Sequence, residues 1–155
     1  MKNKISVLIA DDNTQITDEL SAYIAMQSDM SVAAVAADGG EAWELILETN
    51  PDAVILDMVM PKLDGMGVLR KLKSLSKKPV VVAYSISALQ RTIETAIGLG
   101  ADYYLLKPQT CERVAETVRE LTKSGNTASS AVKQEVDLEA LVTECIHELG
   151  VPAHI

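Results

Sequence analysis

Short apolar runs alternate with amphipathic stretches from residue 5 to about residue 123. The runs are short, rich in Val, Ile and Leu, and bounded by turn residues, which is typical of buried strands. They cover residues 5–10, 30–36, 53–56, 80–84 and 103–106. Between and after them, apolar residues recur at helical spacing, which predicts a helix after each strand. This alternation predicts an α/β, doubly wound fold with a five-stranded parallel sheet, for which we expect the strand order 2-1-3-4-5.

The pattern changes after residue 123. Residues 124–135 are mostly small and polar without periodicity, which predicts a flexible linker between a domain at 1–123 and a further segment at 136–155. That segment repeats apolar residues at helical spacing, namely Leu138, Leu141, Val142, Cys145 and Leu149. A single helix cannot bury such a stripe by itself. We therefore expect it either to dock on the main domain or to begin another domain.

Composition and charge exclude several classes of protein. The chain is 48% apolar with a net charge of −8, and its one lysine cluster is typical of a solvated helix end, so we expect no direct nucleic-acid binding by these residues. That cluster is Lys71, Lys73, Lys77 and Lys78. No apolar run approaches the ~20 residues of a membrane span. Cys111 and Cys145 lack the spacing of a zinc or redox pair. These features favour a cytoplasmic protein.

Chemically useful side chains follow four of the predicted strands. Asp11 and Asp12 follow the first strand, Asp57 the third, Ser85 the fourth and Lys107 the fifth. Ligands bind at the carboxyl ends of parallel strands, where such residues converge. Taken singly, each has a commoner structural explanation, such as a helix cap for the acidic pair. Their joint occurrence predicts a site.

Clustered carboxylates repel one another unless a cation lies between them. Oxygen ligands favour Mg²⁺, with Ca²⁺ possible in the same place. This arrangement suits in-line transfer of a phosphoryl group to a carboxylate, and Asp57, after the middle strand, is the natural acceptor. We expect Lys107 to bind one phosphoryl oxygen and Ser85 to donate a hydrogen bond to another.

At these residues the sequence resembles the receiver domain of two-component response regulators, which have a flavodoxin- or CheY-like fold. The matching segments are residues 10–13, 56–61, 64–65, 98–101 and 106–108. The resemblance makes residues 1–123 a receiver domain and Asp57 the phosphoacceptor. It implies a metal site formed by Asp12, Asp57 and the main-chain carbonyl of Val59, with Asp11 acting mainly through water.

The same resemblance implies that Ser85 is a switch hydroxyl and that Tyr104 is a switch aromatic that turns inward on phosphorylation. Three positions depart from the usual pattern. Ile86 stands where a small residue is usual, Gln109 where an aromatic is common, and Ser85 where threonine is frequent. We expect the branched Ile86 to narrow access for small phosphodonors and water, while the chemistry itself is preserved.

Residues 146–155 resemble the opening of the effector domain in the stage-zero sporulation master regulators of endospore-forming Firmicutes. This implies a phosphorelay response regulator whose DNA-binding domain is truncated after its first helix, with His147 and His154 as effector residues. Its donor would be a phosphotransferase or histidine kinase. Phosphorylation would favour a homodimer through the fourth helix, fifth strand and fifth helix, and DNA would be bound only by the missing domain.

Two other functions remain open. The chain could be a stand-alone phosphorelay module that acts only through protein contacts, which a reading frame ending near residue 155 would favour. It could also be a haloacid-dehalogenase-like phosphohydrolase, which forms an aspartyl-phosphate too. That family needs a second aspartate two residues after the nucleophile, and Val59 occupies this place. We therefore expect a phosphoacceptor with slow autodephosphorylation and not a turnover enzyme.

Overall fold

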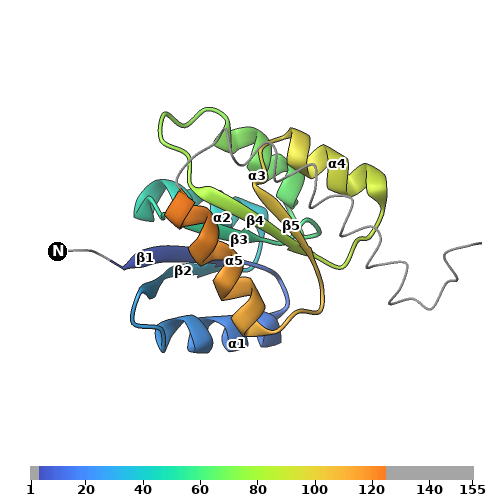
Figure 1. Cartoon of the computed structure of the whole chain (residues 1–155). Coiled ribbons are helices and arrows are strands. Elements are labelled where there is room, and N and C mark those ends of the chain that lie inside the picture. The colour runs from blue at the N-terminus through green and yellow to red at the C-terminus, as the bar shows by residue number, and fades with distance from the viewer. Residues whose placement is uncertain (1–3, 125–155) are drawn as a thin grey trace, which may run out of the picture.

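The computed structural model describes residues 4–124, which form one layer of strands between two layers of helices (Figure 1). The strands are β1 Ile5–Ala10, β2 Met30–Ala36, β3 Ala53–Leu56, β4 Val80–Ser85 and β5 Tyr103–Leu106. The helices are α1 Thr14–Ala25, α2 Gly39–Thr49, α3 Gly65–Leu72, α4 Gln90–Gly98 and α5 Cys111–Ser124.

All neighbouring strands are parallel, and their order is β2-β1-β3-β4-β5. The predicted fold class and strand order are therefore confirmed. The register pairs Ala10 with Leu56 and Leu56 with Ala83, so β1, β3 and β4 finish close together at one edge of the sheet. We call this the carboxyl edge and the opposite one the amino edge.

Apolar side chains fill both faces of the sheet. Along β1, Leu8 and Ala10 pack with α2, α3 and α4, whereas Val7 and Ile9 pack with α1 and α5. All four are fully buried, which explains why the strand is apolar without interruption. The two clusters fix the sheet between the helices and hold the carboxyl edge in place.

Side-chain caps set where several helices begin. Asn13 Oδ1 accepts the N–H of Gln15 at 3.0 Å and that of Ile16 at 3.3 Å at the start of α1. Asp64 Oδ1 accepts the N–H of Gly67 at 3.0 Å, so α3 begins at Gly65. The cap overrides the weak helix propensity of the glycines there.

Two element boundaries lie one residue beyond those predicted from the sequence. Strand β4 continues through Ser85, and α5 continues through Ser124, the first residue of the predicted linker. The rest of that linker and the predicted helix at 136–155 lie outside the described residues. Within residues 4–124, no helix is long and apolar enough to cross a membrane.

Gly39 allows the start of α2 to lie directly against the loop between β3 and α3. A Cβ atom at this position would overlap the main-chain carbonyl oxygen of Leu63. We expect Gly39→Ala to lower the free energy of unfolding by about 1–3 kcal/mol, the usual effect of overpacking. Urea denaturation followed by circular dichroism measures it.

Gly98 offers a matched control, because nothing lies within 4 Å of a Cβ added there and the residue is helical. We expect Gly98→Ala to be neutral or to stabilise by up to ~1 kcal/mol. Equal destabilisation by the two substitutions would contradict the close approach at Gly39.

Candidate functional site

Backbone hydrogen bonds place the candidate residues just beyond the strand ends. The N–H of Asp11 donates to Ala36 O at 3.0 Å, and that of Asp57 donates to Ala10 O at 2.9 Å. The N–H of Lys107 likewise donates to Ser85 O at 2.9 Å. Each residue therefore continues the pairing of its strand by one position, which fixes where its side chain starts.

The structure brings three carboxylates together at the carboxyl edge. One carboxylate oxygen from each of Asp11, Asp12 and Asp57 lies within 4.8 Å of the others. Asp11 and Asp57 are buried, with exposed fractions of 3% and 5%, while Asp12 is exposed. The group thus has two fixed inner members and one member at the solvent boundary.

Lys107 approaches this group from β5. Its Nζ lies 2.7 Å from Asp11 Oδ2 and 3.5 Å from Asp57 Oδ2, and 5.6 Å from the centre of the Tyr84 ring. The other oxygen of Asp11 accepts the N–H of Asn13 at 2.9 Å. Asp11 is therefore satisfied on both oxygens, and the amine is held closer to Asp11 than to Asp57.

The environment of Asp57 disfavours its charged form. Burial is the main cause that raises the pKa of its carboxyl group, and the nearby charge of Asp11 raises it further. The charge of Lys107 and the N–H of Val59, 3.3 Å from Asp57 Oδ1, lower the pKa but do not offset this. The group is therefore short of positive charge.

A hard divalent cation would supply that charge. The clustered donors are all carboxylate oxygens, the ligand type that Mg²⁺ and Ca²⁺ prefer over softer metals. An exposed member, Asp12, leaves a side open to water or to a phosphoryl oxygen. The side chains therefore fit a magnesium site that retains open coordination positions.

Ser85, at the end of β4, and Tyr104, on β5, belong to neighbouring strands. Both are fully buried. The Tyr104 hydroxyl donates to Ser87 O at 2.9 Å, and the N–H of Ser87 contacts Ser85 Oγ at 3.5 Å. The family resemblance implies that the Tyr104 ring turns inward on phosphorylation, but in this structure the ring is already buried. Its hydrogen bond and its burial hold it there.

Ile86 and Gln109, which depart from the usual family pattern, have different surroundings. Ile86 and Val59 are 75% and 61% exposed, so neither side chain buries much surface on the site. Narrowed access at Ile86 remains a prediction. Gln109 is part of a local network, because its N–H donates to the Tyr84 hydroxyl at 2.9 Å and its side-chain amide donates to Leu106 O at 2.9 Å.

Tyr84 is the site residue that sequence reasoning missed. Its ring faces the Lys107 amine, and its hydroxyl holds the chain just after Lys107. In the sequence it stands inside an apolar strand, where an aromatic residue is ordinary core. A tyrosine next to the strand end, with a polar group that needs a partner, is the only signal that could have identified it.

The chain is similar to known proteins over most of the described residues. The profile of the response regulator receiver domain family matches residues 7–119. The signal receiver domain of a protein assigned as the response regulator NarL of Mycobacterium tuberculosis is similar, with 27% identity and a TM-score of 0.75 over 78% of this chain and 98% of that one. The response regulator domain of Thermotoga maritima CheB is similar too, with 26% identity and a TM-score of 0.72 over 78% and 98% of the two chains.

A third similar structure holds a relevant ligand. It is a complex of CheX and CheY with beryllofluoride and magnesium from Borrelia burgdorferi, with 27% identity and a TM-score of 0.70 over 77% of this chain and 90% of that chain.

The raised pKa of Asp57 gives a test of the electrostatics without metal. The folded protein binds this proton more tightly than the unfolded chain does. The resulting stabilisation is present below the unfolded pKa of about 3.9 and is lost as the pH rises through the folded pKa. In EDTA at neutral pH, we expect Asp57→Asn to raise the free energy of unfolding by on the order of 1 kcal/mol.

The gain should shrink as the pH falls, because protonated Asp57 is neutral like asparagine. Asp18, exposed on α1, gives the matched control, and Asp18→Asn should stay within ~0.5 kcal/mol of the wild type. Urea denaturation from pH 3 to pH 8 measures both, and an Asp57→Asn protein less stable than wild type at pH 7 would contradict the argument.

Proposed function

This chain belongs to the family of response regulator receiver domains, and from that premise we propose that Asp57 is its phosphoacceptor. Receiver domains accept a phosphoryl group from a donor and bind Mg²⁺ at an acidic cluster. The supporting observation is the placement of Asp57 at the end of the central strand β3, with the Lys107 amine 3.5 Å from its Oδ2. A buried carboxylate beside a cation can act as nucleophile and hold the charged product.

The metal site we propose consists of Asp11, Asp12, Asp57 and the main-chain carbonyl of Val59. Bound Mg²⁺ would neutralise charge on the incoming phosphoryl group, and Ca²⁺ suits the same oxygen donors. A cation bound there would offset the repulsion between Asp11 and Asp57 and would favour the ionised form of Asp57, the form that acts as a nucleophile. Asp12, the exposed member, is the side chain best placed to meet an arriving ion.

In the transfer step, an Asp57 carboxylate oxygen forms a bond to phosphorus while the bond from phosphorus to the donor breaks. The donor leaves with that electron pair. The Lys107 amine then has to leave Asp11, 2.7 Å away, to bind a phosphoryl oxygen. Its long unbranched side chain allows this movement, and the neighbouring Tyr84 ring favours the cation throughout.

We assign the switch to Ser85, Ser87 and Tyr104. A phosphoryl group on Asp57 would draw the Ser85 hydroxyl toward it and fix the loop between β4 and α4. The Tyr104 hydroxyl is bound to Ser87 in that loop, so the position of the ring and the position of the loop depend on each other. Phosphorylation then stabilises the inward ring already seen, which is a population shift and not a new conformation.

The biological role we propose is that of a phosphorelay response regulator of sporulation. The support is the resemblance of residues 146–155 to the opening of a sporulation effector domain. A phosphotransferase or histidine kinase would act as donor, and DNA would be bound by a domain beyond residue 155. Receiver domains can dimerise, and we place the dimer contact on α4, β5 and α5, next to the switch. The protein then acts as a stoichiometric acceptor and transcriptional switch, with a cytoplasmic location.

The phosphoacceptor assignment predicts metal-dependent labelling. We expect acetyl phosphate to label at most one site per chain in Mg²⁺ and none in EDTA, because charge on the carboxylates blocks approach of an anion. Asp57→Ala should abolish labelling, and Asp18→Ala should retain it. Intact-protein mass spectrometry at acid pH detects the added mass. Label retained in Asp57→Ala would overturn the assignment.

The placement of the dimer contact predicts a difference between two exposed arginines. Arg113 on α5 donates to the Tyr103 hydroxyl of β5 at 3.1 Å, whereas Arg70 lies on α3. We expect beryllofluoride with Mg²⁺ to raise the dimer fraction, Arg113→Ala to lower it and Arg70→Ala to leave it unchanged. Sedimentation velocity measures the fraction, and equal effects of both variants would place the contact elsewhere.

A further inference from the structure

A pocket of about 550 Å³ lies at the amino edge of the sheet, opposite the acidic cluster. Its lining combines two apolar side chains with polar and charged ones, namely Ile5, Asp29, Asp52, Val80, Arg119, Thr122 and Lys123. None of these residues takes part in the phosphoryl chemistry proposed above. The pocket is large enough for several side chains of a peptide.

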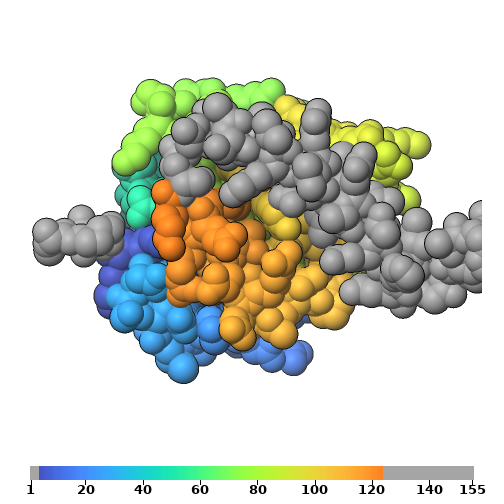
Figure 2. Space-filling model, in the orientation of Figure 1, coloured from blue at the N-terminus to red at the C-terminus, as the bar shows by residue number. Residues whose placement is uncertain are grey.

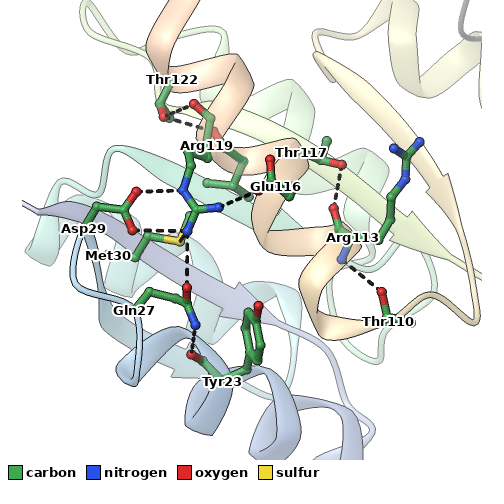
Figure 3. A network of polar contacts seen from close by, with 11 residues as sticks. Tyr23, Gln27, Asp29, Met30, Thr110, Arg113, Glu116, Thr117, Arg119 and Thr122 are labelled. Atoms are coloured by element: carbon green, nitrogen blue, oxygen red, sulfur yellow. Dashed lines mark hydrogen bonds and ion pairs between the residues drawn. The ribbon is translucent and has the colours of Figure 1, made fainter.

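One wall is fixed by Arg119 of α5 (Figure 3). Its guanidinium binds both carboxylate oxygens of Asp29, at 2.6 and 3.1 Å, and it also contacts Gln27 at 3.3 Å and Glu116 at 3.0 Å. A guanidinium held by a bidentate pair and two further acceptors loses little freedom when a ligand arrives. This wall is therefore preformed.

The opposite wall is fixed by Asp52, just before β3. Its Oδ2 accepts the N–H of Ser6 at 2.9 Å and the Ser6 hydroxyl at 3.2 Å, while its carbonyl accepts the N–H of Val80 at 3.0 Å. The side chains of Ile5 and Val80, which also line the pocket, are partly exposed. The base of the pocket thus offers apolar surface for contact.

A strongly basic turn directly precedes Val80, one of the residues that line the pocket. The turn between α3 and β4, residues 73–79, contains Lys73, Lys77 and Lys78 and no acidic residue, although the whole chain carries a net charge of −8. Lys77 and Lys78 are exposed and stand directly before Pro79 and Val80. Figures 1 and 2 show this turn and the end of α5 on the side of the molecule where β1 begins. The approach to the pocket is therefore positively charged and favours an acidic ligand.

The chain itself supplies a segment of matching chemistry. Residues 135–148 contain five acidic residues and no lysine or arginine, together with Leu138, Leu141 and Val142. The last turn of α5 carries Thr122 and Lys123, which line the pocket. The residues between 124 and 135 can span up to ~3.5 Å each, so the acidic segment can reach back to the pocket. A short tether also gives it an effective concentration in the millimolar range.

We propose that the pocket at the amino edge of the sheet is the docking site for residues 135–148 of the same chain. Leu138 and its apolar neighbours contact Ile5 and Val80, and the acidic residues face Lys77 and Lys78. This contact holds the segment that leads away from the domain against the end of α5. It does not depend on phosphorylation of Asp57, so either proposal can fail without the other.

Paramagnetic broadening from a spin label at Cys145 tests this in the full chain. The other cysteine, Cys111, is replaced by serine, and the amide signals of Ile5, Val80 and Thr122 are followed by NMR. We expect these signals to be lost at low ionic strength and to return when Lys77 and Lys78 are both replaced by glutamate. Adding Glu135→Lys and Asp137→Lys to that variant should restore the broadening.

The matched control is Lys62→Glu with Arg91→Glu, two exposed cations away from the pocket that change the net charge equally. We expect the broadening to survive it. Broadening that is absent or spread evenly over the domain overturns the proposal. Broadening of an isotope-labelled chain only by a second, spin-labelled chain would also overturn it and would make the occupant a neighbouring copy. Unchanged signals of distant core amides show that each variant is folded.

Discussion

Repulsion between buried carboxylates at the carboxyl edge is the constraint on which the rest of this structure depends. Asp11 and Asp57 are both buried, and a third carboxylate, that of Asp12, lies within 4.8 Å of them. One amine, Lys107 Nζ, touches both inner members. A single cation cannot balance this group, so the site favours a second positive charge and can accept an anionic ligand only with it. Binding of a cation would therefore favour binding of an anionic phosphoryl group at the same site, because it would reduce the excess negative charge.

The sheet holds these like charges close together. Asp11, Asp57 and Lys107 each continue the backbone pairing of the preceding strand, so none can withdraw without breaking a main-chain hydrogen bond. Apolar clusters on both faces keep the strands in register. The core thus supplies stability that offsets the electrostatic repulsion at the site, a combination that is common at functional sites. The Lys107 side chain can still move, because its four-carbon chain is flexible between the fixed backbone and the amine.

The two edges of the sheet differ in how their carboxylates are balanced by positive charge. The carboxyl edge gathers three carboxylates around one amine, so negative charge is in excess there. At the amino edge, carboxylates are satisfied, because Asp29 is bound by Arg119 and Asp52 by Ser6. Paired charges favour a rigid surface, whereas an excess of one charge favours binding of an ion of the opposite charge. One helix, α5, borders both regions, since it follows Lys107 and ends beside the Arg119 wall.

The sequence by itself determined the strands, the helices and the layering, because uninterrupted apolar runs such as residues 53–56 are stable only when both faces are covered. It also predicted which residues follow each strand, and parallel pairing then brought Asp11, Asp12, Asp57 and Lys107 together. Only the tertiary structure decided what depends on distance. It placed Lys107 closer to Asp11 than to Asp57, put Tyr84 beneath the amine, and left Tyr104 already inside. These outcomes result from packing between segments far apart in the chain, which no local pattern encodes.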